Sequence, residues 1–258
     1  MKKKLLVAIL IVLAIIAIFV ASFCIIKNNK PLESGDVTDK NLNKVGKILE
    51  EAGLGNIDTF KKMVKDSAKA AAKESGFSDA DCRLTVMLLA GDQIKYNTVN
   101  ENYDGDYLMF DLDAIDNDKS FSVLKSKRAL FTTLFGETKI DDTGFTNTHA
   151  KTWHEHGIRL NSKNFSIISI LFETIEKDKA FVGHTGILID TKESKYTDAN
   201  YVFIEKIAFG EPYKITLVND KNELLKILSA RPDYTVEEGE ATPVVYENDV
   251  KIGQLSKN

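Results

Sequence analysis

Three side chains of this sequence have the chemical types needed for nucleophilic catalysis: a cysteine, a histidine and a carboxylate. Cys82 could attack an amide carbonyl, because a thiolate is a strong nucleophile, although a free thiol is mostly protonated at neutral pH. A nearby histidine such as His184 can take up that proton, and a third polar group such as Glu205 can orient the ring. We therefore take Cys82, His184 and Glu205 as the candidate catalytic residues.

Cys82 stands near the start of a strongly apolar segment, SDADCRLTVMLLAGD, which spans residues 78–92. Ser78 and Asp81 have the spacing of a capping box, which predicts a helix that begins near Ser78. A helix N-terminus stabilises negative charge, and its backbone N–H groups can hold an oxyanion. Asp79 and Asp81 would disfavour a thiolate if they faced the sulfur, so we expect them to act as caps.

A structural role is the alternative for each of the three residues. The only other cysteine, Cys24, lies in an apolar segment, so Cys82 has no intramolecular partner and could be a free reactive thiol. Free cysteines are, however, often buried and inert. His184, which lies between two glycines, could bind a backbone carbonyl, and Glu205 alone would be a charge on an edge strand.

His184 and Glu205 lie in two segments rich in β-branched and aromatic residues, 180–190 and 201–209, which predict strands. If residues 191–200 connect them, antiparallel pairing brings His184 within about two positions of Glu205, a separation of about 4.5–8 Å. Strand alternation predicts two sets of residues that share a face: Val182, His184, Gly186 and Leu188, and Tyr201, Phe203, Glu205, Ile207 and Phe209.

The remaining pattern predicts an α+β fold in which helices come first and an antiparallel sheet follows. Residues 97–165 are hard to read, and the acid-rich stretch 100–118 is expected to be a polar loop followed by a strand. Residues 242–253 predict a terminal hairpin that turns at Asn248 and Asp249. We expect helices at 41–53, 57–76 and from Ser78, further strands at 165–175 and 212–218, and a helix at 219–230 capped by Asn219 or Asp220.

The N-terminal residues predict a membrane anchor. Three lysines at positions 2–4 precede an uncharged apolar run over residues 5–26, which is long enough to cross a bilayer. Positive charge is denser before this run than after it, which favours a cytoplasmic N-terminus. We expect a cytoplasmic start at 1–4, a transmembrane segment at 5–26, a linker at 27–40 and one extracellular domain at 41–258. Cleavage after Ser22 and lipidation of Cys24 are alternatives that also place the domain outside the cell.

Composition argues against several other classes of protein. The formal net charge is −4 and the lysines are spread among acids, so we expect no nucleic-acid partner. The sequence has no GxxxxGK, CxxC or HExxH motif, and we expect no cofactor. Three more histidines, His149, His154 and His156, surround Trp153, but their spacing matches no standard metal site. We expect no metal there and a solvated segment anchored by Trp153.

A cysteine at the start of a buried helix, followed by GHTGILI at 183–189 and a polar residue on the next strand, resembles the papain-like peptidases and amidases. The NlpC-type cell-wall endopeptidases are the most similar group, and the resemblance implies Cys82 as nucleophile, His184 as base and Glu205 as orienting group. The longer stretches 181–190 and 202–214 resemble a family of bacterial surface proteins catalogued as domain of unknown function 4300. About 100 residues separate Cys82 from His184, and a glutamate holds the third place; both features depart from the NlpC pattern.

We therefore expect a papain-like extracellular hydrolase that transfers an acyl group to water. Its expected partners are a cell-envelope peptide or small amide as substrate, and the membrane through the N-terminal helix. The alternative is a non-catalytic cell-surface binding or scaffolding protein that retains the same fold. A thiol-dependent redox or acyl-carrying protein is a third possibility, which the absence of a resolving cysteine disfavours.

Overall fold

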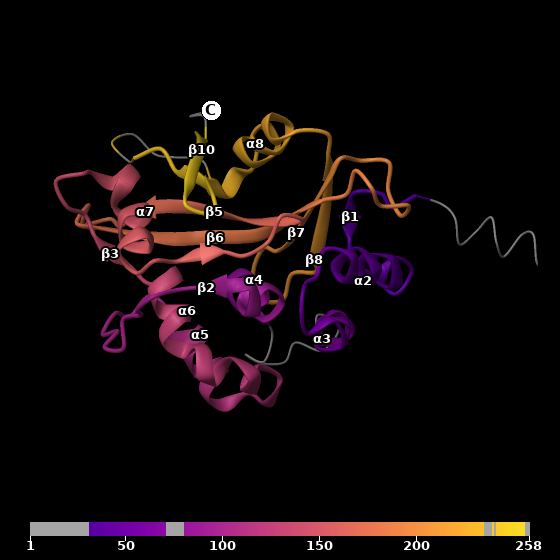
Figure 1. The fold of residues 1–258 in the computed structure, drawn as a ribbon, viewed down its shortest axis with the longest axis horizontal. Coiled ribbons are helices and arrows are strands. Elements are labelled where there is room, and N and C mark those ends of the chain that lie inside the picture. Colours follow the sequence, from indigo (N-terminus) through magenta and orange to yellow (C-terminus); the bar gives the residue numbers. More distant parts are fainter. Residues whose placement is uncertain (1–30, 71–79, 235–238, 240, 256–258) are drawn as a thin grey trace, which may run out of the picture.

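One antiparallel sheet organises the computed structural model, which describes residues 31–70, 80–234, 239 and 241–255 (Figure 1). The expected fold class, α+β with an antiparallel sheet, is confirmed. The expected transmembrane segment at 5–26 lies outside the described residues. Within the described ranges, no helix combines the length and apolar character needed to span a bilayer.

The sheet runs in the order β1-β8-β7-β6-β5-β9-β10, and the short strand β3 also pairs with β6. Each of these ladders is antiparallel, and the sequential pairs β5–β6, β6–β7, β7–β8 and β9–β10 are joined by short connections that favour this pairing. A separate two-stranded ribbon joins β2 (Ile94–Lys95) to β4 (Arg159–Leu160). The sheet strands are β1 (Gly35–Asp36), β3 (Thr138–Lys139), β5 (Phe165–Glu173), β6 (Lys179–Asp190), β7 (Tyr201–Lys206), β8 (Tyr213–Val218), β9 (Val244–Glu247) and β10 (Val250–Gln254).

Helices cover both faces of the sheet. Figure 1 shows α8 above the sheet and the helices α2 to α6 below it. Two apolar cores correspond to these two layers, because strand residues alternate between the faces. The helices are α2 (Leu42–Glu51), α3 (Ile57–Ala70), α4 (Cys82–Ala90), α5 (Met109–Asn117), α6 (Arg128–Phe135), α7 (Phe145–Glu155) and α8 (Lys221–Ser229), with 3₁₀ turns η1 (Gly91–Gln93), η2 (Lys119–Lys127) and η3 (Pro232–Tyr234).

Helix α4, which begins with the candidate nucleophile Cys82, is almost entirely buried. Every residue of α4 except Arg83 is buried, as the continuous apolar pattern predicts. Asp81 is the N-cap, and its carboxylate accepts a hydrogen bond from the Leu84 N–H at 2.9 Å. The helix therefore begins at Cys82 rather than near Ser78, and Ser78 lies outside the described residues.

The strands of the central ladder lie where the sequence predicts them, but one face assignment is wrong. Leu171 pairs with Val182 and Ile170 pairs with His184, so the ladder skips Gly183 at a β-bulge. A bulge adds one residue to a strand and reverses the alternation beyond it. Val182 therefore packs in the core of the N-terminal helices and does not share a face with His184.

Several boundaries also differ from the expectation. Part of the expected linker packs on the domain, since Gly35 and Asp36 pair with β8 and Leu32 and Val37 are buried. Two predicted strands are shorter than expected: β5 ends before Ile175, which is 93% exposed. Strand β7 likewise ends at Lys206, before the exposed Phe209. The predicted end of the second helix at Gly76 lies outside the described residues.

The acid-rich stretch contains a helix, so the strand expected there is wrong. Leu108, Leu112 and Ile115 are buried at helical spacing and hold α5 against its neighbours. Asp111 of this helix is buried as well. The C-terminal predictions are confirmed: Asp220 caps α8 through the Glu223 N–H, and the final hairpin turns at Asn248, whose φ is 55°.

Candidate active site

The three candidate residues meet in the interior of the protein. Cys82 is a free cysteine, is 3% exposed and is the first residue of α4. His184 of β6 is also 3% exposed, and Cys82 lies near enough to act on the pKa of its ring as a side-chain hydrogen-bond partner. The second contact of the ring is with Glu205 of β7, whose Oε2 lies 2.8 Å from His184 Nε2. The structure therefore brings all three sequence-predicted residues together in one line of contacts.

The register of β6 and β7 places His184 near Glu205. Gly186 is the residue paired with Glu205, so His184 stands two positions away along the same strand. Gly186 has no room for a side chain, because a Cβ there would lie 2.5 Å from the Phe203 ring and 2.9 Å from the Ile204 carbonyl. The ring of Phe203 fills the space beside Gly186, and this packing fixes the two strands in register.

A gap in the ladder lets α4 reach β6. Strand β5 occupies one edge of β6 from Ala180 to Ile189, so β3 and β7 must both lie along its other edge. The pairing with β3 ends at Ala180 and the pairing with β7 begins at Gly186. Arg83 of α4 approaches the edge between these two points, where its Nη1 donates to the Val182 carbonyl at 3.3 Å. This contact fixes the first turn of α4 beside His184.

The electrostatics of His184 favour its protonated form. Burial lowers the pKa of His184, but hydrogen bonds to Cys82 and Glu205 and the negative charges of both groups outweigh burial and raise the pKa to about 9. Burial likewise raises the pKa of Glu205, yet its bonds to His184 and Arg231 prevail and lower the pKa to about 2. Glu205 is therefore ionised and His184 is protonated at neutral pH.

A fourth residue, Arg231, binds the far side of Glu205. Arg231 Nη1 lies 2.8 Å from Glu205 Oε2, and Nη2 lies 2.5 Å from Oε1. Arg231 also donates to the Tyr234 hydroxyl at 3.4 Å, and the Tyr234 ring lies 6.1 Å from the His184 ring. Sequence reasoning missed Arg231, because it follows the last helix and carries no motif that links it to β7.

A second ionic cluster lies behind the nucleophile. Arg83 Nη2 is 2.8 Å from Asp81 Oδ2 and 2.9 Å from Asp111 Oδ2. Burial and the neighbouring charge of Asp81 raise the pKa of Asp111 to about 8, although Arg83 opposes the shift. Asp81 therefore caps α4, as expected, and its carboxylate also forms an ion pair with Arg83. Asp79, the other expected cap, lies outside the described residues.

Aromatic rings border this region. The ring of Tyr107 lies 4.2 Å from that of Phe181 and 5.1 Å from the Arg83 guanidinium. Phe172 lies 6.0 Å from Phe181 and 5.9 Å from Tyr234, so four rings connect the surroundings of Arg83 to those of His184. Tyr234 is buried, Phe172 and Phe181 are half-buried and Tyr107 is exposed, so this row of rings runs from the interior to the surface.

The other histidines lie on α7 and after it, away from these residues in sequence and contacts. His149 is fully buried, and its Nε2 lies 3.1 Å from the Gly136 carbonyl oxygen. Trp153 is buried and donates to the Leu134 carbonyl, so the predicted anchoring by Trp153 is confirmed. Of these histidines, His154 is exposed and His156 is half-buried, with its Nδ1 3.0 Å from the Thr98 hydroxyl, so the segment is less solvated than expected. Over the described ranges, no cluster of His, Cys, Asp and Glu could hold a metal ion.

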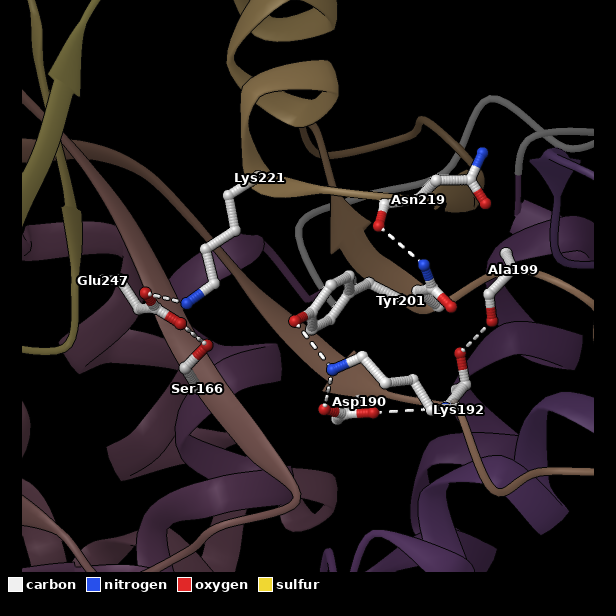
Figure 2. Close-up of polar contacts among 10 residues, drawn as sticks. Ser166, Asp190, Lys192, Ala199, Tyr201, Asn219, Lys221 and Glu247 are labelled. Carbon is white, nitrogen blue, oxygen red and sulfur yellow. Dashed lines mark hydrogen bonds and ion pairs between the residues drawn. The ribbon is translucent and has the colours of Figure 1, made fainter.

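A second set of polar contacts lies at the C-terminal end of β6 (Figure 2). Lys192 lies 2.7 Å from Asp190 and 3.0 Å from the Tyr201 hydroxyl, which ties the turn after β6 to β7. Lys221 and Ser166 both bind Glu247, which ties α8 to β9 and β5. In each group, side chains of opposite charge or complementary polarity satisfy one another, so we assign these contacts a structural role.

Known proteins give one positive comparison. A family model described as a domain of unknown function, DUF4300, matches residues 37–252, which is most of the chain. Searches of curated proteins and of solved structures found no match. The family match includes Cys82, His184, Glu205 and Arg231, so the whole candidate site lies inside the shared domain. The chain therefore belongs to the family described as a domain of unknown function, DUF4300.

Proposed function

We propose that this chain is an extracellular cysteine hydrolase, with a papain-like arrangement of helix and sheet, that cleaves amide bonds of cell-envelope peptides. The observation that carries the proposal is the buried line of contacts from Cys82 through His184 to Glu205. Ionisable groups with strongly shifted pKa values occur preferentially at functional sites, because burying them is costly. A thiol placed against a protonated imidazole at a helix start is the arrangement that nucleophilic catalysis requires.

In the proposed reaction, the Cys82 sulfur attacks the carbonyl carbon of an amide, and a C–S bond forms. His184, which carries the proton, transfers it to the amide nitrogen as the C–N bond breaks and the amine leaves. A water molecule then gives a proton to His184 and attacks the thioester. The acid is released and the Cys82–His184 pair is restored. Glu205 remains ionised throughout and stabilises the imidazolium, as carboxylates do in related triads.

The first turn of α4 supplies donors for the oxyanion that this reaction forms. Asp81 satisfies the N–H groups of Leu84 and Thr85 through its side chain and carbonyl. The N–H groups of Cys82 and Arg83 have no hydrogen-bond partner among the described residues. Such unpaired donors at a helix start bind negative charge, and we assign the Cys82 N–H to the oxyanion.

The proposed location follows from the N-terminal sequence. An apolar run at 5–26 after three lysines supports a single-pass anchor, with the domain on the outer side of the membrane. Envelope peptides are the amide substrates present on that side, which is why we favour them over other amides.

A non-catalytic binding protein is the second candidate, and one observation favours it. Cys82 and His184 are each only 3% exposed, so a substrate carbonyl must displace neighbouring groups to reach the sulfur. A surface protein that retained this fold as a scaffold would keep the same buried contacts and would need no access to Cys82.

Digestion of purified cell-wall fragments distinguishes the two candidates. The full-length protein is incubated with the fragments, and the products are identified by mass spectrometry. A hydrolase releases new peptide products with the wild-type chain and none with Cys82→Ser or His184→Gln. His154→Gln is the matched control, because His154 is exposed and lies outside the line of contacts. Fragment binding without cleavage by all of these proteins would favour the scaffold.

A further inference from the structure

We propose that Arg231 is a positioning residue of this site: it fixes the Glu205 carboxylate, and through it the orientation of the His184 ring toward Cys82. The inference rests on the proposed function, because it assigns a role in the same reaction. It adds a residue from the C-terminal part of the chain to a site otherwise built from α4, β6 and β7.

The geometry of the contact is that of a two-pronged clamp. Arg231 Nη1 lies 2.8 Å from Glu205 Oε2 and Nη2 lies 2.5 Å from Oε1, so the guanidinium binds both carboxylate oxygens. Oε2 also receives His184 Nε2 at 2.8 Å. A bidentate pair fixes the plane of the carboxylate as well as its position, which a lysine ammonium does not do.

The clamp fixes the carboxylate that holds one ring nitrogen of His184. Because Nε2 of His184 is held by Glu205, Nδ1 is the nitrogen that remains for Cys82. Rotation of the Glu205 carboxylate would break its bond to Nε2. Because Glu205 is 1% exposed, water could not replace the lost hydrogen bonds. The orientation of the ring therefore depends on the groups that hold Glu205.

Arg231 is itself held in place. It follows the C-terminal end of α8, and its backbone N–H donates to the Leu228 carbonyl at 3.1 Å. Pro232, the next residue, begins η3, and Tyr234 of this turn accepts a hydrogen bond from Arg231. The guanidinium thus extends from an ordered turn, as a positioning group must.

The charges around His184 come from several elements. Cys82 lies on α4 with Arg83 and its cap Asp81, and Asp111 of α5 binds Arg83. Tyr107 and Tyr234 are the neighbouring phenols. Lys206, the residue after Glu205, donates instead to the Ala208 and Glu211 carbonyls. Among the described contacts, Arg231 is therefore the cation that neutralises Glu205 beside the His184 imidazolium.

Removing this cation has a predictable effect on the thiol. With Arg231 present, thiolate, imidazolium, carboxylate and guanidinium sum to zero charge. Without it, the buried network carries one excess negative charge, which is costly at low dielectric. Uptake of one proton by the network relieves that cost, so we expect the reactive form of the site to require a higher pH.

The test is the pH profile of Cys82 alkylation by iodoacetamide in the full-length chain, with peptide mass spectrometry to separate Cys82 from Cys24. For Arg231→Gln we expect the midpoint of the profile to rise by about one pH unit, which lowers the rate near pH 6 about tenfold. Arg231→Lys keeps the charge but not the two-pronged contact, so its midpoint should lie between those of the wild type and Arg231→Gln. Arg128→Gln, which alters a half-buried arginine paired with Asp116, should reproduce the wild-type profile.

A double-mutant comparison separates positioning through Glu205 from a general structural effect. In a Glu205→Gln background, Arg231→Gln should cause little further shift, because its target is gone. A wild-type profile for Arg231→Gln, or additive shifts in the double variant, would overturn the role of Arg231. If Arg231→Gln does not fold, Arg231→Met and Glu205→Gln/Arg231→Met, which also remove the charge, decide the question by the same criterion. If Cys82 of the wild-type chain is alkylated slowly, and at the same rate in His184→Ala, the result would instead count against the proposed hydrolase.

Discussion

His184 and Glu205 bind each other across a diagonal of the β6–β7 ladder, with Nε2 and Oε2 2.8 Å apart, although Glu205 is paired with Gly186. Diagonal neighbours in a sheet are normally farther apart than direct pairs. The contact is possible because long side chains extend from both positions on one face while the residue between them, Gly186, has no side chain. The candidate site therefore depends on the strand register as much as on its polar residues.

Gly186→Ala should destabilise the protein. The added Cβ would meet the Phe203 ring at 2.5 Å and the Ile204 carbonyl oxygen at 2.9 Å, and the backbone contact cannot rotate away. Overpacking of this kind costs about 1–3 kcal/mol, which denaturant unfolding measures. Gly55→Ala is the matched control, because a Cβ there meets its nearest atoms at ordinary distances of 3.5 and 3.6 Å. Equal stability of the two variants would refute the packing argument.

His149 should make the protein sensitive to acid. Burial lowers the pKa of His149 to about 4 in the folded state, despite its bond to Gly136, from an ordinary value of 6.5. The unfolded chain thus binds a proton that the folded chain excludes, and stability is lost as pH falls from about 6.5 to 4. The loss is on the order of 3 kcal/mol.

Unfolding of His149→Gln as a function of pH tests this prediction. The variant should lose stability less steeply over that interval than the wild-type chain does. His154→Gln, which changes an exposed histidine on the same helix, should keep the wild-type slope. Parallel pH curves for His149→Gln and the wild type would count against a buried neutral His149.

Asp111 should act in the opposite direction as pH rises from about 4 to about 8. Burial and the charge of Asp81 raise the pKa of Asp111 to about 8, so the folded state holds a proton that the unfolded state releases near pH 4. Stability from this group is present at low pH and declines as pH rises toward about 8, by at most about 1.4 kcal/mol per pH unit. Asp111→Asn should flatten the decline, whereas Asp113→Asn, on the exposed side of α5, should not.

The proposed hydrolysis should have an alkaline limit set by His184. The amine leaves only when the imidazolium can protonate it, and Cys82 and Glu205 hold the pKa of His184 at about 9 against the effect of burial. Cleavage of cell-wall fragments should therefore fall as pH rises through about 9. Glu205→Gln removes one of the charges that stabilise the imidazolium, so the cleavage rate should begin to fall at lower pH. A fall at the same pH as in the wild type would show that Glu205 does not raise the pKa of His184.

The sequence predicted the helix and strands of the site better than it predicted how the strands pair and which face each residue occupies. The apolar run after Cys82 and the β-branched segments around His184 and Glu205 predicted α4, β6 and β7, because burial imposes those patterns. The bulge at Gly183 reversed the face of Val182, which strand alternation alone does not indicate. Local patterns thus identify strands, while their pairing depends on the partner strand.

Two features of the site depend on contacts between distant segments, and sequence patterns did not predict them. Arg231 reaches Glu205 only because α8 packs over the sheet, and no local spacing connects the two residues. Asp111 reaches Arg83 from a helix whose acidic composition had suggested a loop and a strand. The helical spacing of its three buried apolar residues was the signal that could have identified α5.

The most direct measurement of the central claim is the rate at which iodoacetamide modifies Cys82 below pH 7. If Cys82 and His184 form a thiolate–imidazolium pair, modification of the full-length chain is rapid at about pH 6 and becomes at least about tenfold slower in His184→Ala. His154→Ala, at an exposed position, leaves the rate unchanged. Slow modification of Cys82 that is the same with and without the His184 imidazole would contradict the account.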